Sequence, residues 1–309
     1  FIIKIMPDNK NKIIFIVGFP RSGTTWFSNL LNAHPEVVYR HEIIGRCYEI
    51  FGDKLFNDLK FNHGLTLEQQ GIFLNKLAIA SVETDRPPFF HKTVLKIANK
   101  NIHKTAWLAT KSLPILSYFY QYFFTPSPTK NKMFLLKETR STINLDSILK
   151  GVSPDSIIFL FREPYGAIAS HVKGLKLKTM GGMSKKSNET WLNAHAQRSY
   201  IKTLIEDGFD FEAASDVEIL AIKWRVYNDD LLEYKKTFSK AMFCHYDQFA
   251  QSPVKLTEQL FKDINLDFVP EVKQFISESG NKDEKQNILQ KDASSDFFSV
   301  YRPSGFNKE

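Results

Sequence analysis

The sequence predicts an α/β fold in which helices flank a central, mostly parallel β-sheet with a P-loop-like phosphate-binding loop. Three observations support this prediction. Short apolar runs rich in β-branched and aromatic residues recur along the chain, which is typical of strands buried on both faces. Helical patterns separate these runs, as in sheets whose parallel strands are joined by crossover helices. The first run enters a glycine-containing loop and then a helical pattern.

The elements follow from these patterns in chain order. Residues 1–12 are expected to form a lead-in or an edge strand, and residues 13–17 the first buried strand. The pattern from Trp26 to Leu31 predicts a helix, which ends before Pro35 because proline disfavours helical geometry in the preceding residue. The other expected strands are 37–39, 133–136, 156–161 and 242–246. The other expected helices are 68–80, 145–149, 189–205, 217–234 and 253–265.

Two segments have less regular patterns. Residues 115–124 are dense in aromatics, which predicts a helix packed on the core or, alternatively, rings that line a substrate pocket. Residues 173–189 are rich in lysine, glycine, methionine and serine, which predicts a mobile loop that serves as a lid.

Composition narrows the function classes. The chain has 309 residues, 43% of them hydrophobic and 24% charged, as in ordinary soluble proteins. Its net charge of +7 suits a polyanionic ligand. We expect no nucleic-acid partner, because no basic run is interleaved with aromatics, and no membrane partner, because no apolar run approaches the roughly 20 residues of a span. Cys47 and Cys244 are far apart in sequence, which favours reduced thiols and a cytoplasmic location.

The loop after the first strand is predicted to hold a phosphate or sulfate group. Backbone N–H groups at a helix N-terminus favour an anion, and glycine allows its close approach. Ser22, Thr24 and Thr25 add hydroxyl donors, and Arg21 adds a positive charge. The spacing of Gly18 and Gly23 matches the start of a Walker A motif, but Thr24 replaces its lysine. This substitution argues against an ordinary nucleoside triphosphatase.

A second anion site is predicted at the end of the strand 156–161. Arg162 follows that strand, and Ser170 lies eight positions further on in the next helical pattern. Arginine grips a phosphate through two hydrogen bonds, and a serine hydroxyl adds another. Two helical turns bring the serine back beside the strand end. The alternative is a surface salt bridge from Arg162 to Glu163 or Asp155.

These motifs carry a resemblance to a known family. The segment from Phe19 to Trp26, Phe-Pro-Arg-Ser-Gly-Thr-Thr-Trp, resembles the 5′-phosphosulfate loop of sulfotransferases that use 3′-phosphoadenosine 5′-phosphosulfate (PAPS). Arg162 and Ser170 resemble the 3′-phosphate motif of the same family, and residues 220–270 resemble its C-terminal part. The resemblance implies that PAPS is the cosubstrate and that 3′-phosphoadenosine 5′-phosphate (PAP) is the product. We expect no metal, because cationic side chains can neutralise the charge and the sequence has no compact cluster of aspartate and histidine ligands. The implied PAPS-binding residues are Arg21, Ser22, Gly23, Thr24, Thr25, Trp26, Arg162, Ser170, Tyr246 and Arg302.

Two of these roles have alternatives. Trp26 is expected to stack on the adenine, or else to pack in the core. Arg302 is expected to reach the 3′-phosphate from the tail, although Tyr301-Arg302-Pro303 matches the basic C-terminal loop of the family poorly.

The catalytic residues are expected at the ends of the second and third strands. Arg21 and Lys137 are the implied cations that neutralise the leaving group. The cytosolic branch of the family has Lys-Thr-His at the third strand, with histidine as the base, whereas this chain has Thr139 at the histidine position. The tyrosylprotein branch uses a glutamate after the second strand, and Glu42 occupies the matching position.

Glu42 is therefore the expected base, because burial raises the pKa of a glutamate towards that of a useful proton acceptor. His41 and Glu138 are the other candidates. The alternative for Glu42 is a structural ion pair with Arg40 or Arg46.

The expected function is sulfonate transfer to a hydroxyl of a small molecule, with natural products among the candidate acceptors, by a single domain spanning 1–309. Insertions at about 43–130 and 172–215 are expected to select the acceptor. The alternatives are a tyrosylprotein or carbohydrate sulfotransferase, a P-loop kinase, and a non-catalytic module that binds PAP. The oligomeric state stays open.

Overall fold

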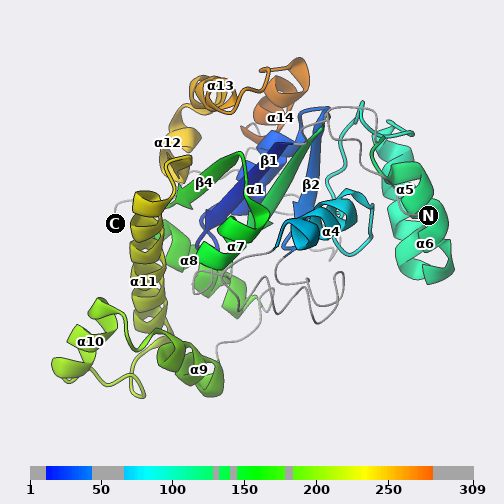
Figure 1. Ribbon diagram of the computed structural model, residues 1–309. Coiled ribbons are helices and arrows are strands. Elements are labelled where there is room, and N and C mark those ends of the chain that lie inside the picture. The colour runs from blue at the N-terminus through cyan, green and yellow to red at the C-terminus, as the bar shows by residue number, and fades with distance from the viewer. Residues whose placement is uncertain (1–11, 44–65, 128–131, 140–144, 178–183, 281–309) are drawn as a thin grey trace.

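Five parallel strands form one sheet with the order β2-β3-β1-β4-β5 (Figure 1). The computed structural model describes residues 12–43, 66–127, 132–139, 145–177 and 184–280. The strands are β1 (Lys12–Gly18), β2 (Val37–His41), β3 (Met133–Glu138), β4 (Ser156–Phe161) and β5 (Ala241–His245). All five expected strands are present, and the predicted α/β class is confirmed.

Helices cover both faces of the sheet (Figure 1). They are α1 (Thr24–Asn32), α4 (Leu67–Ala78), α5 (Lys100–Ser112), η2 (Pro114–Leu116), α6 (Ser117–Phe124), α7 (Leu145–Val152), α8 (Pro164–Lys176), α9 (Lys185–His195), α10 (Ser199–Glu206), α11 (Asp216–Thr237), α12 (Tyr246–Gln251), α13 (Pro253–Asp263) and α14 (Pro270–Gly280).

The core has two halves because alternate strand residues point to opposite faces. Phe15 and Phe159 lie in the half that packs against α4, α7 and α11. Ile14, Ile16 and Ile158 lie in the half that packs against α1, α13 and α14. Apolar residues on both faces explain why the strands read as continuous hydrophobic runs.

Two expectations about the segment before α11 are wrong. The helix predicted over 189–205 is two helices, since α9 ends at His195 and α10 starts at Ser199. The chain turns between them, so that Ile201 of α10 packs in a small cluster with Trp191 of α9 and with α11. The loop predicted over 173–189 is helical at both ends, in α8 and in α9, and residues 178–183 lie outside the described part.

The pattern analysis missed α5, because its buried face is only His103, Trp107 and Thr110. The side chain of Asn99 caps this helix by accepting hydrogen bonds from two of its first backbone N–H groups. The helix expected over 115–124 is η2 and α6, with Tyr120 and Phe124 buried and other rings exposed. Residues 1–11 and Cys47 lie outside the described residues, whereas Cys244 is buried and unpaired.

Candidate functional site

The carboxyl ends of the five strands meet at one edge of the sheet, where ligands bind in open α/β folds. The register pairs His41 of β2 with Lys137 of β3, and Phe161 of β4 with His245 of β5. The residues at and just after the strand ends therefore gather along this edge. They appear in the order Glu42, Lys137, the loop after β1, Arg162 and Tyr246.

The loop after β1, residues 18–25, forms a tight turn into α1. The Ser22 N–H donates to the Phe19 carbonyl at 3.0 Å. Arg21 and Gly23 both have left-handed backbone, with φ of 73° and 82°. No side chain of the described residues caps α1 at its N-terminus, and its first turn has no acidic residue. The helix thus presents uncapped N–H groups and the positive end of its dipole, as an anion site requires.

Packing makes both glycines of this loop necessary. A Cβ on Gly18 would lie 2.7 Å from Cγ2 of Thr24 and 2.8 Å from the Leu160 carbonyl oxygen. A Cβ on Gly23 would lie 2.2 Å from Cδ2 of Tyr246. The backbone of the loop therefore lies directly against β4 and against the first residue of α12.

The two sequence motifs interlock in the structure. Arg21 Nε donates to Ser170 Oγ at 3.0 Å, and Arg162 Nη1 donates to the Arg21 carbonyl at 3.0 Å. The Arg162 guanidinium lies over the Tyr246 ring, with 4.8 Å between Cζ and the ring centre. Among the described residues, the buried atoms Ser22 Oγ and Arg162 Nε have no hydrogen-bond partner. These donors fit an incoming polyanion.

A second uncapped helix adjoins the first one. α8 starts at Pro164, two residues after Arg162, and its N-cap residue Glu163 makes no side-chain capping hydrogen bond. The alternative salt bridge from Arg162 to Glu163 or Asp155 is not among the contacts of the described residues. The Asp155 carboxylate accepts a hydrogen bond from the Ile13 N–H at 2.8 Å instead. Arg162 Nε lies 4.0 Å from Asp247, whose carboxylate also accepts from the Glu163 N–H.

Asp247 was missed by the sequence analysis. The available signal was an acidic residue following the last strand, but it required knowing that β5 lies beside β4.

Glu42 and Lys137 form an ion pair at the ends of β2 and β3. Lys137 Nζ lies 2.8 Å from Glu42 Oε1, and the Thr139 hydroxyl donates to the same oxygen at 3.3 Å. The lysine side chain is only 3% exposed, whereas that of the glutamate is 23% exposed. Glu42 has left-handed backbone with φ of 46°, which turns it back over β3. The burial expected of Glu42 is therefore incomplete. Thr139, which the sequence analysis treated only as a missing histidine, is a direct contact of this carboxylate.

The other candidate bases have different surroundings. His41 Nδ1 lies 2.9 Å from the Tyr39 hydroxyl, and its Nε2 lies 3.8 Å from Glu42 Oε2. Burial, followed by the charge of Glu42, raises the pKa of Tyr39 well above its ordinary value, so that hydroxyl stays protonated. Glu138 is 1% exposed and, as the neighbour of Lys137 in β3, points to the opposite face of the sheet from Lys137.

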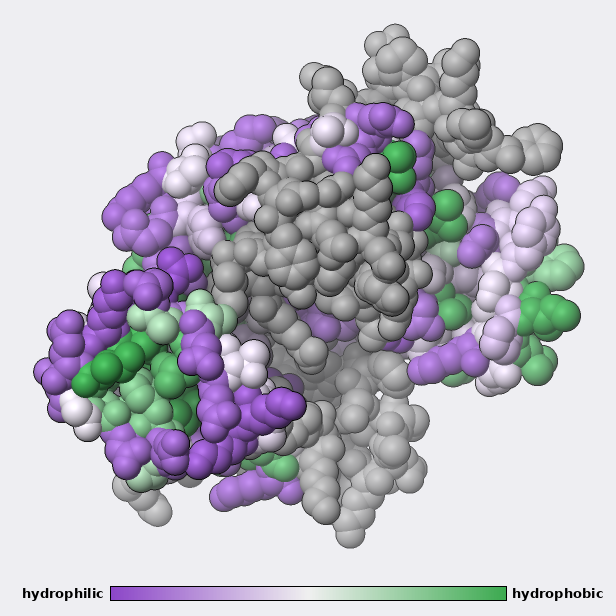
Figure 2. Space-filling view, turned by 60° about the horizontal axis from the view of Figure 1, so that its bottom comes forward, coloured by the Kyte–Doolittle hydropathy of each residue, from purple (hydrophilic) through white to green (hydrophobic). Residues whose placement is uncertain are grey.

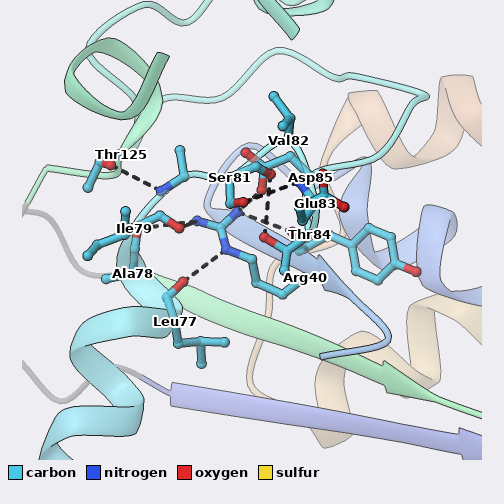
Figure 3. A network of polar contacts seen from close by, with 12 residues as sticks. Arg40, Leu77, Ala78, Ile79, Ser81, Val82, Glu83, Thr84, Asp85 and Thr125 are labelled. Atoms are coloured by element: carbon cyan, nitrogen blue, oxygen red, sulfur yellow. Dashed lines mark hydrogen bonds and ion pairs between the residues drawn. The ribbon is translucent and has the colours of Figure 1, made fainter. Parts of the chain in front are cut away.

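Arg40 anchors β2, the strand that ends just before Glu42 (Figure 3). Its guanidinium donates to the carbonyls of Leu77 and Ala78 at the C-terminus of α4, at 2.9 and 3.2 Å. It also pairs with the buried carboxylate of Asp85 at 2.6 Å. The proposed pairing of Glu42 with Arg40 is therefore wrong, since Arg40 has this buried partner instead. Arg46, the other proposed partner, lies outside the described residues.

The aromatic residues near the loop are packed rather than open. Trp26 is 2% exposed, its Nε1 donates to Ser279 Oγ at 3.1 Å, and its ring lies edge-on to Tyr246. Core packing, the alternative to adenine stacking, thus describes Trp26 in this structure. Tyr246 is 4% exposed and lies beneath both Gly23 and Arg162. Arg302 lies outside the described residues.

The electrostatics of the loop are positive. Burial first, and then the charges of Arg21 and Lys223, lower the pKa of His171, which holds this histidine neutral beside Phe19. Within the described parts of the chain, no group of three potential metal ligands is found.

Comparisons with known proteins agree with this geometry. A family model for the Sulfotransferase family matches residues 14–214 of the chain. A search of curated proteins gives no significant match.

Similar solved structures include the sulfotransferase domain from the curacin biosynthetic pathway, at 15% identity over 87% of this chain and 78% of that one, with a TM-score of 0.44. The sulfotransferase domain of the Synechococcus PCC 7002 olefin synthase gives 15% identity, coverage of 96% and 87%, and a TM-score of 0.44. Mouse sulfotransferase SULT7A1 in complex with PAP is 12% identical over 97% of this chain and 78% of that one, with a TM-score of 0.43. TM-scores this low carry no argument, so the family assignment rests on the family model, which spans more than half of the chain.

Proposed function

Because the chain belongs to the sulfotransferase family, we propose that it transfers a sulfonate group from PAPS to a hydroxyl of a small molecule and releases PAP. One observation supports the donor most strongly. Two uncapped helix N-termini, those of α1 and α8, follow adjacent parallel strands and are joined by the contacts of Arg21 with Ser170 and with Arg162. A nucleotide with anionic groups at both its 5′ and 3′ positions matches two such sites.

In this proposal the loop of residues 18–25 binds the 5′-phosphosulfate. The N–H groups at the start of α1 and the hydroxyls of Thr24 and Thr25 would donate to its oxygens. Arg162 and Ser170 would bind the 3′-phosphate. Both already contact Arg21, so the two anionic ends of the donor would meet a preformed frame.

The transfer step is an in-line displacement at sulfur. The acceptor hydroxyl oxygen forms a bond to the sulfur, while the bond between the sulfur and the 5′-phosphate oxygen breaks. The electron pair of that bond stays on the phosphate oxygen, where Arg21 and Lys137 neutralise the developing charge. The acceptor proton passes to Glu42, whose side chain is partly exposed.

The Glu42–Lys137 ion pair is then the resting state of the site. Arrival of the donor gives Lys137 a second anion to bind, namely the oxygen that bridges sulfur and phosphate. A lysine that turns to this oxygen weakens its hold on Glu42, so the carboxylate becomes a better proton acceptor when the donor is in place. Donor binding and activation of the base are coupled in this way.

The acceptor is proposed to be small, and its choice is assigned to residues 43–130 and 172–215. These segments lie outside the two anion-binding motifs. The base position resembles the tyrosylprotein branch, so a tyrosine-containing peptide belongs in the acceptor screen beside phenols and alcohols.

The test is calorimetric binding of PAP and of ADP without metal. The wild type is expected to bind PAP more than about tenfold more tightly than ADP, a preference worth about 1.4 kcal/mol or more. Arg162→Ala should remove this preference, whereas Arg225→Ala, at an exposed arginine paired with Asp229, should keep it. ADP binding equal to PAP binding and indifferent to Arg162 would overturn the proposal and favour a kinase.

A second measurement separates catalysis from binding. Glu42→Gln is expected to bind PAP normally and to form no sulfated product in an acceptor screen followed by mass spectrometry. Binding of PAP by the wild type without turnover of PAPS would instead identify a PAP-binding module.

A further inference from the structure

We propose that the surface formed by α5, η2 and α6 binds an anionic lipid bilayer. The proposal does not depend on the sulfonate-transfer chemistry. It rests on exposed apolar side chains, on exposed lysines around them and on a sequence segment without acidic residues.

The apolar part of this surface is an aromatic tip, which consists of Leu113, Ile115, Tyr118, Phe119 and Tyr122. These side chains are 59%, 85%, 74%, 60% and 56% exposed. α5 and α6 lie at the margin of the molecule in Figure 1, on the right, and hydrophobic side chains gather on the same side in Figure 2. Large apolar side chains grouped in this way mark an interaction surface.

The tip is not explained by packing inside the chain. α6 buries Tyr120 and Phe124, which lie four residues apart on one helical face. These two residues already anchor the helix, because Tyr120 donates to Asp85 at 2.8 Å and Phe124 stacks on His103. The remaining rings of α6 point away from the core, where polar residues would serve solubility better.

Charge around the tip selects the partner. From Arg86 to Lys137 the sequence contains no aspartate or glutamate. Lys96, Lys100, Lys104 and Lys111 are exposed on and just before α5. The Lys96 ammonium lies 3.6 Å from the ring centre of Tyr122, so at least one of these cations borders the rings. An anionic partner complements this surface.

A bilayer fits these features better than a protein does. Tyrosine and phenylalanine are suited to the boundary between water and acyl chains, and lysines beside them reach the lipid headgroups. A second copy of the chain would bring the same lysines towards one another and is disfavoured. Among the helices of the described ranges, none has the length and hydropathy of a membrane span. The proposed contact is with the surface of the bilayer. This differs from the sequence-based expectation of no membrane partner, which considered only spanning segments.

The experiment is co-sedimentation of the full chain with vesicles of phosphatidylcholine, with and without phosphatidylserine. The wild type is expected to bind the anionic vesicles, and binding should fall as salt increases. The triple variant Ile115→Ser, Tyr118→Ser, Phe119→Ser should lose binding by more than tenfold. Lys100→Gln with Lys104→Gln should weaken binding by about fivefold for each lysine removed.

A matched control separates this surface from hydrophobicity in general. The triple variant Val217→Ser, Leu232→Ser, Val254→Ser removes exposed apolar side chains from α11 and α13 and should bind vesicles as the wild type does. Circular dichroism verifies that every variant is folded. Failure of the wild type to bind anionic vesicles, or binding that survives loss of the tip, overturns the proposal. So does a concentration-dependent dimer that the tip variant abolishes, because the tip would then bind a second copy.

Discussion

The ion pair between Glu42 and Lys137 yields a quantitative prediction, because its two partners are buried so unequally. Lys137 is 3% exposed and Glu42 is 23% exposed, with 2.8 Å between Nζ and Oε1. Removing the glutamate charge strands a buried ammonium, whereas removing the lysine leaves a carboxylate that water can reach. The variants Glu42→Gln and Lys137→Met, singly and combined, therefore have different expected stabilities.

The size of the effect follows from simple electrostatics. At an effective dielectric constant of about 20, two charges this far apart attract by roughly 6 kcal/mol, which is a gross value before desolvation. Glutamine keeps an oxygen that accepts from the ammonium. We therefore expect Glu42→Gln to lower the free energy of unfolding by about 2–4 kcal/mol.

Lys137→Met is expected to lower the free energy of unfolding by only about 1 kcal/mol, because methionine packs beside the apolar core and water hydrates the exposed side of Glu42. The double variant strands no charge and should resemble Lys137→Met. The double-mutant cycle then gives a coupling of about 2 kcal/mol or more. Urea unfolding followed by circular dichroism at neutral pH measures all four proteins. The reasoning would be refuted if the losses of unfolding free energy in the two single variants added up to that of the double variant within about 0.5 kcal/mol. It would also be refuted if Lys137→Met lost more stability than Glu42→Gln.

Two other changes have defined outcomes. Gly23→Ala, at a φ of 82° with a ring atom 2.2 Å from the new Cβ, should weaken PAP binding in calorimetry by more than about tenfold. Burial first, and then the charges of Arg40 and Lys92, lower the pKa of His103 to about 3. The unfolded chain gains a proton on this histidine below about pH 6.5 and the folded chain does not, so stability is complete above that pH and falls below it. Between about pH 7 and about pH 5, protonation of this histidine in the unfolded chain lowers the free energy of unfolding by about 2 kcal/mol. In urea unfolding, His103→Gln should therefore lose about 2 kcal/mol less than the wild type over the same pH range.

Each of these two predictions has its own control. Gly208 has a φ of 76°, and no described atom lies within 4 Å of a Cβ placed there. Gly208→Ala should thus lower the free energy of unfolding by about 1–2 kcal/mol through backbone strain alone and leave PAP binding unchanged. If both alanine variants bind PAP as the wild type does, the close packing of Gly23 is unimportant for the site. If His103→Gln shows the full pH dependence of the wild type, other histidines account for it.

The sequence predicted the strands well because each is buried on both faces and reads as an apolar run. The loop after β1 was predictable because Gly18, Arg21 and Gly23 lie close together in sequence. The pattern of Arg162 and Ser170 was equally local. Each of these features depends on neighbours within one strand–loop–helix unit.

Features that join distant parts of the chain were not predictable. Asp85 is 45 positions from Arg40, and no sequence pattern predicts that the two form an ion pair. The contact of Asp247 with Arg162 depends on β5 lying beside β4, which is a property of strand order. Thr139 reaches Glu42 only because β2 and β3 are neighbours in register.

The strand order has a consequence for how such a protein can change. β1 lies in the middle of the sheet, with β3 and β2 on one flank and β4 and β5 on the other. In the proposed mechanism the two anion-binding motifs follow β1 and β4, and the proton acceptor follows β2. Lys137 of β3 serves both sides, because it pairs with Glu42 and would bind the bridging oxygen of the donor. Mutations around the end of β2 leave the two anion-binding motifs intact. A chain built in this way can acquire new acceptors during evolution, or in a directed-evolution experiment, while it inherits its nucleotide chemistry unchanged.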